Sequence, residues 1–119
     1  MDNKDFSIQL EKRTKVFAID TIKLSAGLPK SQEGNVIRNQ LTKSGTSIGA
    51  NYREANRSRS KADFANKIKI CESEASETYY WLEIIQEIKW INETKLNSIL
   101  KEADELLAIF TSIGNKLKR

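Results

Sequence analysis

Residues that interrupt helices are scarce in this chain, and their scarcity restricts its fold more than any other feature. The 119 residues include one proline and five glycines. Pro29 disfavours helical geometry at the residue before it, the polar stretch 56–60 forms a second break, and the run from Ile91 to Thr94 forms a third. Four long helices are therefore predicted, at about 6–28, 32–56, 61–91 and 94–117.

Two of these breaks also carry residues that begin helices. The segment 60–63, Ser-Lys-Ala-Asp, has the form of a capping box, in which the serine side chain accepts a hydrogen bond from the third helical residue. Asn92 or Thr94 can cap the last helix in a similar way.

Each predicted helix carries apolar or small residues spaced three or four apart, which places them on one helical face. They are Phe6, Leu10, Phe17, Leu24 and Leu28 in the first helix; Ile37, Leu41, Gly45, Ile48 and Ala55 in the second; Phe64, Ile68, Cys71, Ala75, Thr78, Leu82 and Ile85 in the third; and Leu96, Leu100, Ala103, Leu107, Phe110 and Leu117 in the fourth. We expect an all-α, antiparallel, up-down-up-down four-helix bundle that forms a single domain over residues 1–119.

The composition excludes several classes of function. Histidine, the commonest general base and metal ligand, is absent. Cys71 is the single cysteine, so no internal disulfide can form, which fits a reducing cytoplasm. The longest apolar run, 106–110, is too short to cross a membrane, and residues 1–5 lack the features of a signal peptide. We expect a cytoplasmic protein that is not an enzyme, holds no metal or cofactor and does not enter a membrane.

Two of the predicted helices carry a second apolar stripe away from the first. These outer stripes are Ile8, Ile19, Ile22 and Ala26 in the first helix, and Ile70, Trp81, Ile84, Ile88 and Ile91 in the third. A folded surface exposes some apolar residues in any case, but five in one line favour an interface. The expected interface consists of Ile19, Ile22, Trp81, Ile84 and Ile88.

The position of these stripes favours a ring. In an antiparallel bundle the first and third helices lie diagonally, so their outer stripes face different sides. Two different patches on one subunit favour head-to-tail contacts, which close into rings. We therefore expect a cyclic homo-oligomer rather than a two-fold dimer.

The net charge of +4 is unevenly distributed, because residues 32–60 carry five basic and two acidic side chains. The densest basic cluster comprises Arg53, Arg57, Arg59 and Lys61. Arg53 and Arg57 share a face if the helix extends that far, and arginine suits phosphate because its planar guanidinium can bind two oxygens. The alternative is that these residues only balance the negative end of the second helix. In a ring, repetition of the cluster would create a basic rim or lumen.

Other candidate sites have a structural interpretation that we prefer. The acidic residues of the third helix lack the histidine that a bundle di-iron site requires, and Cys71 lies on the core stripe. The aromatic run 79–81 could stack nucleic-acid bases, but packing is preferred. The small residues at 44–50 lack the ending of a phosphate-binding loop and would instead let a neighbouring helix approach closely.

The central third of the chain resembles a known bacterial family. Residues 40–51, with Ser-Ile-Gly-Ala-Asn at 47–51, followed by Glu54, Ser60 and the pair Asp63-Phe64, resemble the motif of proteins encoded by intervening sequences of 23S rRNA genes. The accessory variability proteins of diversity-generating retroelements form a related branch. The resemblance covers residues 6–117, but this chain has Glu54-Ala55 where the family commonly has Glu-Gly.

The resemblance implies a pentameric ring of four-helix bundles with a basic surface that interacts with nucleic acid, and no enzymatic activity. In the retroelement branch it implies binding to a reverse transcriptase. The favoured hypothesis is a non-catalytic protein that contacts the phosphates of RNA or of an RNA–DNA hybrid. The alternative is a structural scaffold whose partner is another protein, such as a reverse transcriptase.

Overall fold

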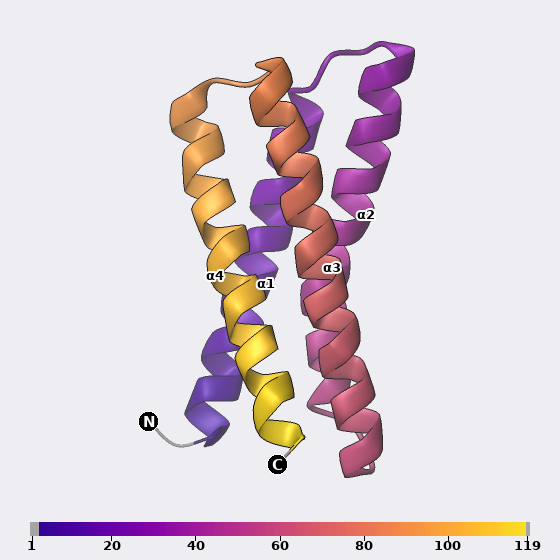
Figure 1. Cartoon of the computed structure of the whole chain (residues 1–119), viewed down its shortest axis with the longest axis vertical. Helices are drawn as coiled ribbons and strands as arrows, with labels where there is room; N and C mark the ends of the chain where they lie inside the picture. The colour runs from indigo at the N-terminus through magenta and orange to yellow at the C-terminus, as the bar shows by residue number, and fades with distance from the viewer. Residues whose placement is uncertain (1–2, 119) are drawn as a thin grey trace.

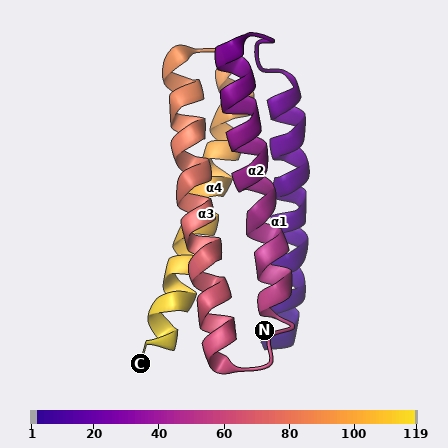
Figure 2. The same cartoon turned by 90° about the vertical axis from the view of Figure 1, so that its right-hand side faces the viewer.

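The computed structural model describes residues 3–118, and within them every regular element is a helix. The helices are α1 (Asn3–Ala26), α2 (Gln32–Ala55), α3 (Lys61–Ile88) and α4 (Glu93–Leu117). Successive helices run side by side in opposite directions and form a bundle of 44 × 26 × 21 Å (Figures 1 and 2). The predicted all-α, up-down-up-down architecture is confirmed.

The four helices occupy the corners of the bundle in chain order. α2 packs along α1 and α3, and α4 packs along α3 and α1, whereas the backbones of the diagonal pairs lie farther apart. α1 and α3 are thus diagonal, as the sequence predicted. Their outward faces point to different sides of the molecule.

The helices begin at capping residues. Ser60 Oγ accepts a hydrogen bond from Asp63 N at 3.0 Å, which confirms Ser60 as the N-cap of α3. Asn92 Oδ1 accepts from Thr94 N at 2.8 Å, so Asn92 is the cap of α4. Ser31 caps α2 in the same manner.

Two helices end earlier than predicted. α1 ends at Ala26 rather than near residue 28, and Arg38 donates to the carbonyl oxygens of Leu28 and Pro29 at 3.0 and 2.8 Å beyond that end. α3 ends at Ile88 rather than at residue 91, because Lys89 adopts a left-handed conformation with φ 59°. A left-handed residue turns the chain away from the helix axis.

The predicted stripes form most of the core. Buried at its centre are Phe17, Ile48, Leu82 and Phe110, and the ring of Tyr52, which the sequence pattern did not predict, meets Phe110 edge-on at 5.5 Å. The stripe prediction was wrong at the chain ends. Phe6 and Leu117 are 41% and 42% exposed, because they lie at the end of the bundle where packing is incomplete.

Small residues bring α1 and α2 close together. A β-carbon added at Gly45 would lie 2.5 Å from Thr21 Cγ2, and one added at Gly49 would lie 3.0 Å from Thr14 Oγ1. Both threonines are buried, and each hydroxyl donates to a carbonyl oxygen of its own helix. The interpretation of residues 44–50 as a surface for close helix approach is confirmed at these two positions.

Candidate nucleic-acid interface

The four predicted nucleic-acid-binding residues lie around the turn that joins α2 to α3. Arg53 is in the last turn of α2, Arg57 and Arg59 are in the connection, and Lys61 is the first residue of α3. All four are exposed. Arg53 and Arg57 do not share a helical face as the sequence suggested, since α2 ends at Ala55 before Arg57 is reached.

Arg53 differs from the other three in having an acidic partner. Its Nε lies 3.6 Å from Glu11 Oε1, on α1. Asn56 Nδ2 donates to the other oxygen of the same carboxylate at 2.8 Å. Glu11 therefore offsets part of the charge of Arg53. Within residues 3–118, Arg57, Arg59 and Lys61 form no ion pair.

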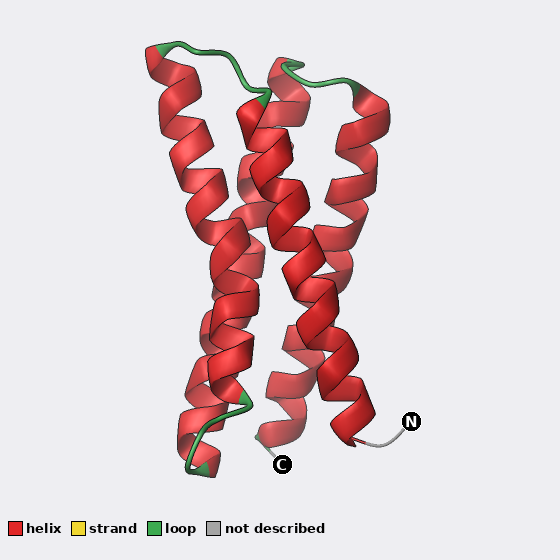
Figure 3. Ribbon diagram, turned by 180° about the vertical axis from the view of Figure 1, so that it is seen from behind, coloured by secondary structure: helices red, strands yellow, loops and turns green. Residues whose placement is uncertain are grey.

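The structure adds two cations that the sequence analysis did not single out. Antiparallel packing brings the C-terminal end of α4, with Lys116 and Lys118, to the same end of the bundle as the α2–α3 turn (Figures 1 and 3). We call Arg57, Arg59, Lys61, Lys116 and Lys118 the basic end. The run Lys-Leu-Lys-Arg at 116–119 was the sequence signal, although Arg119 lies outside the described residues.

A surface hollow of 540 Å³ joins the two parts of the basic end. It is lined by Ser58, Arg59, Ser60, Lys61, Phe64, Lys116 and Leu117. Its cations therefore come from the α2–α3 turn, from the first turn of α3 and from α4. Acidic side chains also lie at this end, namely Asp5, Glu54 and Asp63, but the cations outnumber them, whereas the opposite end carries Lys23, Lys30 and Lys89 together with Glu33, Glu87 and Glu93. Concentrated positive charge at one end attracts polyanions.

The predicted oligomer interface is exposed in this chain to different degrees. Ile19, Ile22 and Ile88 are 42%, 49% and 44% exposed. Trp81 and Ile84 are half-buried, and Trp81 Nε1 donates to Glu77 Oε2 at 3.3 Å. Two outer stripes on diagonal helices thus remain accessible. Ile91 does not extend the α3 stripe, because it lies beyond the helix and lines the side between α1 and α4.

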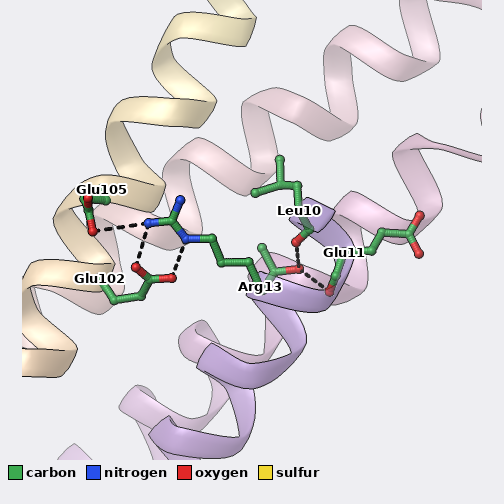
Figure 4. A network of polar contacts seen from close by, with 6 residues as sticks. Leu10, Glu11, Arg13, Glu102 and Glu105 are labelled. Carbon is green, nitrogen blue, oxygen red and sulfur yellow. Dashed lines mark hydrogen bonds and ion pairs between the residues drawn. The ribbon is translucent and has the colours of Figure 1, made fainter. Parts of the chain in front are cut away.

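The α1–α4 side contains the shortest ion pair among the described residues. Arg13 donates from Nε to Glu102 Oε2 at 2.6 Å and from Nη2 to Glu102 Oε1 at 2.7 Å, and Nη2 also reaches Glu105 at 3.2 Å (Figure 4). These hydrogen bonds to Glu102 raise the pKa of Arg13. Glu102 and Glu105 also line a groove of 850 Å³ between α1 and α4, whose other charged residues include both acidic Asp20 and basic Lys23.

Cys71 and the aromatic run 79–81 were the other candidate site residues, and most of them pack against the core. Cys71 is buried, its Sγ donates to the carbonyl oxygen of Ile48 at 3.5 Å, and burial raises its pKa to about 12, so the thiol is protonated. Of the aromatic run, Tyr79 and Trp81 pack against the core as predicted, whereas Tyr80 is 55% exposed. Across residues 3–118 no group of three potential ligands gathers closely enough for a metal ion, and no helix is long and apolar enough to cross a membrane.

The chain is similar to one family model and to a solved structure. The family model described as 23S rRNA-intervening sequence protein matches residues 7–112. The structure is similar to the 1.70 Å crystal structure of a protein with unknown function from the S23 ribosomal protein family of Bacteroides thetaiotaomicron VPI-5482. The two chains are 38% identical with a TM-score of 0.81, and the match covers 87% of this chain and 96% of the other. A search among curated proteins finds no match.

The match to the family model extends from the second turn of α1 into α4, and so includes all of α2 and α3. It contains the motif at 47–51 and the pair Asp63-Phe64 on which the resemblance was based. The chain therefore belongs to the 23S rRNA-intervening sequence protein family.

Proposed function

We propose that this protein is a non-catalytic nucleic-acid-binding protein that contacts RNA phosphates through its basic end. The observation that carries the proposal is the gathering of five exposed cations, Arg57, Arg59, Lys61, Lys116 and Lys118, which form no ion pair within residues 3–118. Cations without acidic partners are available to replace the counterions of a phosphate backbone. The family description, which refers to a 23S rRNA gene, supports RNA as the nucleic acid and the cytoplasm as the location.

A ring of identical subunits would strengthen this binding. One bundle offers few phosphate contacts, and affinity rises with the number of phosphates that are neutralised. Cyclic symmetry places equivalent ends of all subunits at the same height along the ring axis, so the basic ends would form one rim. The interface that we propose joins Ile19 and Ile22 of one copy to Trp81, Ile84 and Ile88 of the next, and a pentamer is the ring that the family resemblance implies.

The charges of the two outer helices support this pairing. α1 carries five basic and three acidic side chains, and α3 carries three basic and six acidic side chains. A head-to-tail contact between α1 and α3 would bring a net positive helix against a net negative one. Such complementarity favours the α1–α3 contact over contacts between two copies of the same helix.

Binding to RNA at two salt concentrations tests the proposed function. Fluorescence anisotropy with a structured RNA is expected to show an affinity that falls steeply between about 50 and 200 mM salt. The double variant Arg57→Gln, Arg59→Gln should bind more weakly and with a shallower salt dependence, by about 0.7–0.9 in the logarithmic slope for each phosphate that is no longer neutralised. The matched control, Lys23→Gln with Lys30→Gln, removes the same charge at the opposite end and should bind like the parent. Equal effects of the two double variants, or an affinity independent of salt, would overturn the proposal.

The scaffold hypothesis is the second candidate, and the exposed outer stripes favour it. Apolar patches on a folded surface mark protein contacts, and a partner such as a reverse transcriptase could occupy one of them in place of a second copy. A complex formed mainly by apolar burial would persist at high salt, unlike a phosphate contact. Salt dependence therefore distinguishes the two candidates in one experiment.

A further inference from the structure

The hollow at the basic end combines two kinds of surface. Arg59, Lys61 and Lys116 supply positive charge, whereas Phe64 and Leu117 supply apolar area. Binding the phosphates on the outside of a regular duplex requires only the cations of this hollow. The apolar part therefore calls for a ligand that has an apolar face as well as a negative charge.

The apolar part of the hollow is accessible, and its aromatic residue is held in place. Phe64 is half-buried and packs against the hydrophobic core, which restricts its side chain. Leu117 is 42% exposed although it lies on the predicted core stripe.

We propose that this hollow holds one unpaired nucleotide of a bound RNA. The phosphate would lie on Arg59, Lys61 and Lys116, and the base would pack against Phe64 and Leu117. The inference rests on the proposed function and names its ligand more narrowly, as RNA with unpaired nucleotides. A base within a duplex is already stacked and paired, so its face is not available to a protein side chain.

The location of the hollow is compatible with the proposed ring. It is formed by the start of α3 and the end of α4, whereas Ile84 and Ile88 lie at the other end of α3. Contacts between subunits at Ile84 and Ile88 would therefore leave the hollow open. Each subunit of a ring would then offer one nucleotide site beside the shared rim of cations.

The test compares a twelve-nucleotide single-stranded RNA with a twelve-base-pair RNA duplex at the same salt concentration. The parent should bind the single strand with a preference that Phe64→Leu reduces about tenfold, because leucine fills much of the space in the core but lacks the aromatic face. Binding of the duplex and the salt dependence should stay as in the parent, since no cation is changed. Phe64→Trp, which keeps an aromatic face, should retain the preference. Tyr80→Leu removes an exposed aromatic ring outside the hollow and should have no effect.

Circular dichroism and the urea midpoint verify that each variant is folded. If Phe64→Leu does not fold, Leu117→Ser is the deciding variant, because it removes apolar area at a 42% exposed position of the hollow and should also reduce the preference for the single strand. The inference is overturned if Phe64→Leu weakens duplex and single strand equally, or if the parent shows no preference. In those cases salt-dependent binding through Arg57 and Arg59 would still support the proposed function. Absence of binding to either RNA would overturn both proposals.

Discussion

Gly45 controls the distance between α1 and α2. A methyl group there would lie 2.5 Å from Cγ2 and 3.0 Å from Cβ of Thr21, a residue with no exposed surface. Alanine in a helix is otherwise favoured over glycine by about 0.5–1 kcal/mol. We expect the clash to exceed this gain, because overpacking a core costs about 1–3 kcal/mol. Gly45→Ala should therefore lower the free energy of unfolding, measured in urea.

Two further variants separate the clash from helix propensity. Gly114 lies in α4 with no atom within 4 Å of an added β-carbon, so Gly114→Ala should raise the free energy of unfolding by about 0.5–1 kcal/mol. Adding Thr21→Ala to Gly45→Ala removes Cγ2 and Oγ1 and should recover part of the loss. Stabilisation by Gly45→Ala alone would show that α1 and α2 can move apart at no cost.

Cys71 makes stability depend on pH in alkaline solution. Burial raises the pKa of its thiol from 9.0 to about 12, so between these values the unfolded chain has released the proton and the native chain still holds it. The unfolded state then binds fewer protons, and the free energy of unfolding falls as pH rises above 9. The contribution is complete below pH 9 and is lost as pH approaches 12.

Cys71→Ala provides the comparison for this pH dependence. The variant should be less stable at about pH 8, because it leaves a small cavity beside Ile48. Its stability should nevertheless decline less steeply than that of the parent between about pH 9 and pH 11, as other titrating groups are common to both chains. The free energy of unfolding of both proteins is measured in urea at each pH. If it falls equally steeply with pH in both, the assignment of this pH dependence to Cys71 is contradicted.

The surroundings of Arg53 and Lys116 could not be predicted from the local sequence. Arg53 belongs to the densest basic cluster of the sequence, yet Glu11 lies beside it in the fold. Lys116 is far from that cluster in the sequence, yet it lines the same hollow as Arg59. Both facts depend on which helices meet at one end, and local spacing contains no information about that.

Lys89 shows how the end of a single element is set. It is the one residue other than glycine with positive φ among residues 3–118. The left-handed conformation costs about 1–2 kcal/mol for a residue with a β-carbon, and glycine avoids this cost. Lys89→Gly should therefore raise the free energy of unfolding by about 1 kcal/mol, whereas Lys89→Ala, which also removes the charge, should leave it nearly unchanged. Equal stabilisation by both variants would indicate a charge effect instead.

The number of helices, most helix starts and the ends of α2 and α4 were predictable, but the ends of α1 and α3 were not. Ser60 and Asn92 are recognisable caps because their side chains form the capping hydrogen bonds locally. The end of α3 at Ile88 carries no glycine or proline, so the apolar pattern through Ile91 predicted a longer helix. The true end depends on Lys89 accepting an unfavourable conformation while Ile91 turns toward the α1–α4 side.

Positive charge is concentrated at one end of the bundle, and exposed apolar residues lie along two of its sides. The bundle itself was predictable, because stripes spaced three and four apart require burial on every helix. The basic end required the fold, since its two parts come from residues 57–61 and 116–118. The proposed interface residues on α3, Trp81, Ile84 and Ile88, lie toward the other end of the bundle, so assembly through them would leave the basic end free.

The proposed rim exists only in an oligomer, so assembly decides how strongly the protein binds RNA. Ile22 and Ile88 are nearly half exposed, so lysine at either position can reach water without disturbing the core. Sedimentation at micromolar concentration should show the parent as a multiple of 13.6 kDa and Ile88→Lys as a folded monomer. Val36→Lys, at a 54% exposed site on α2 outside both stripes, should sediment like the parent.

The Ile88→Lys monomer should also bind RNA more weakly than the parent, although Arg57, Arg59 and Lys116 are unchanged, because fewer phosphates are neutralised at once. A parent that sediments as a 13.6 kDa monomer would exclude the interface and the rim together.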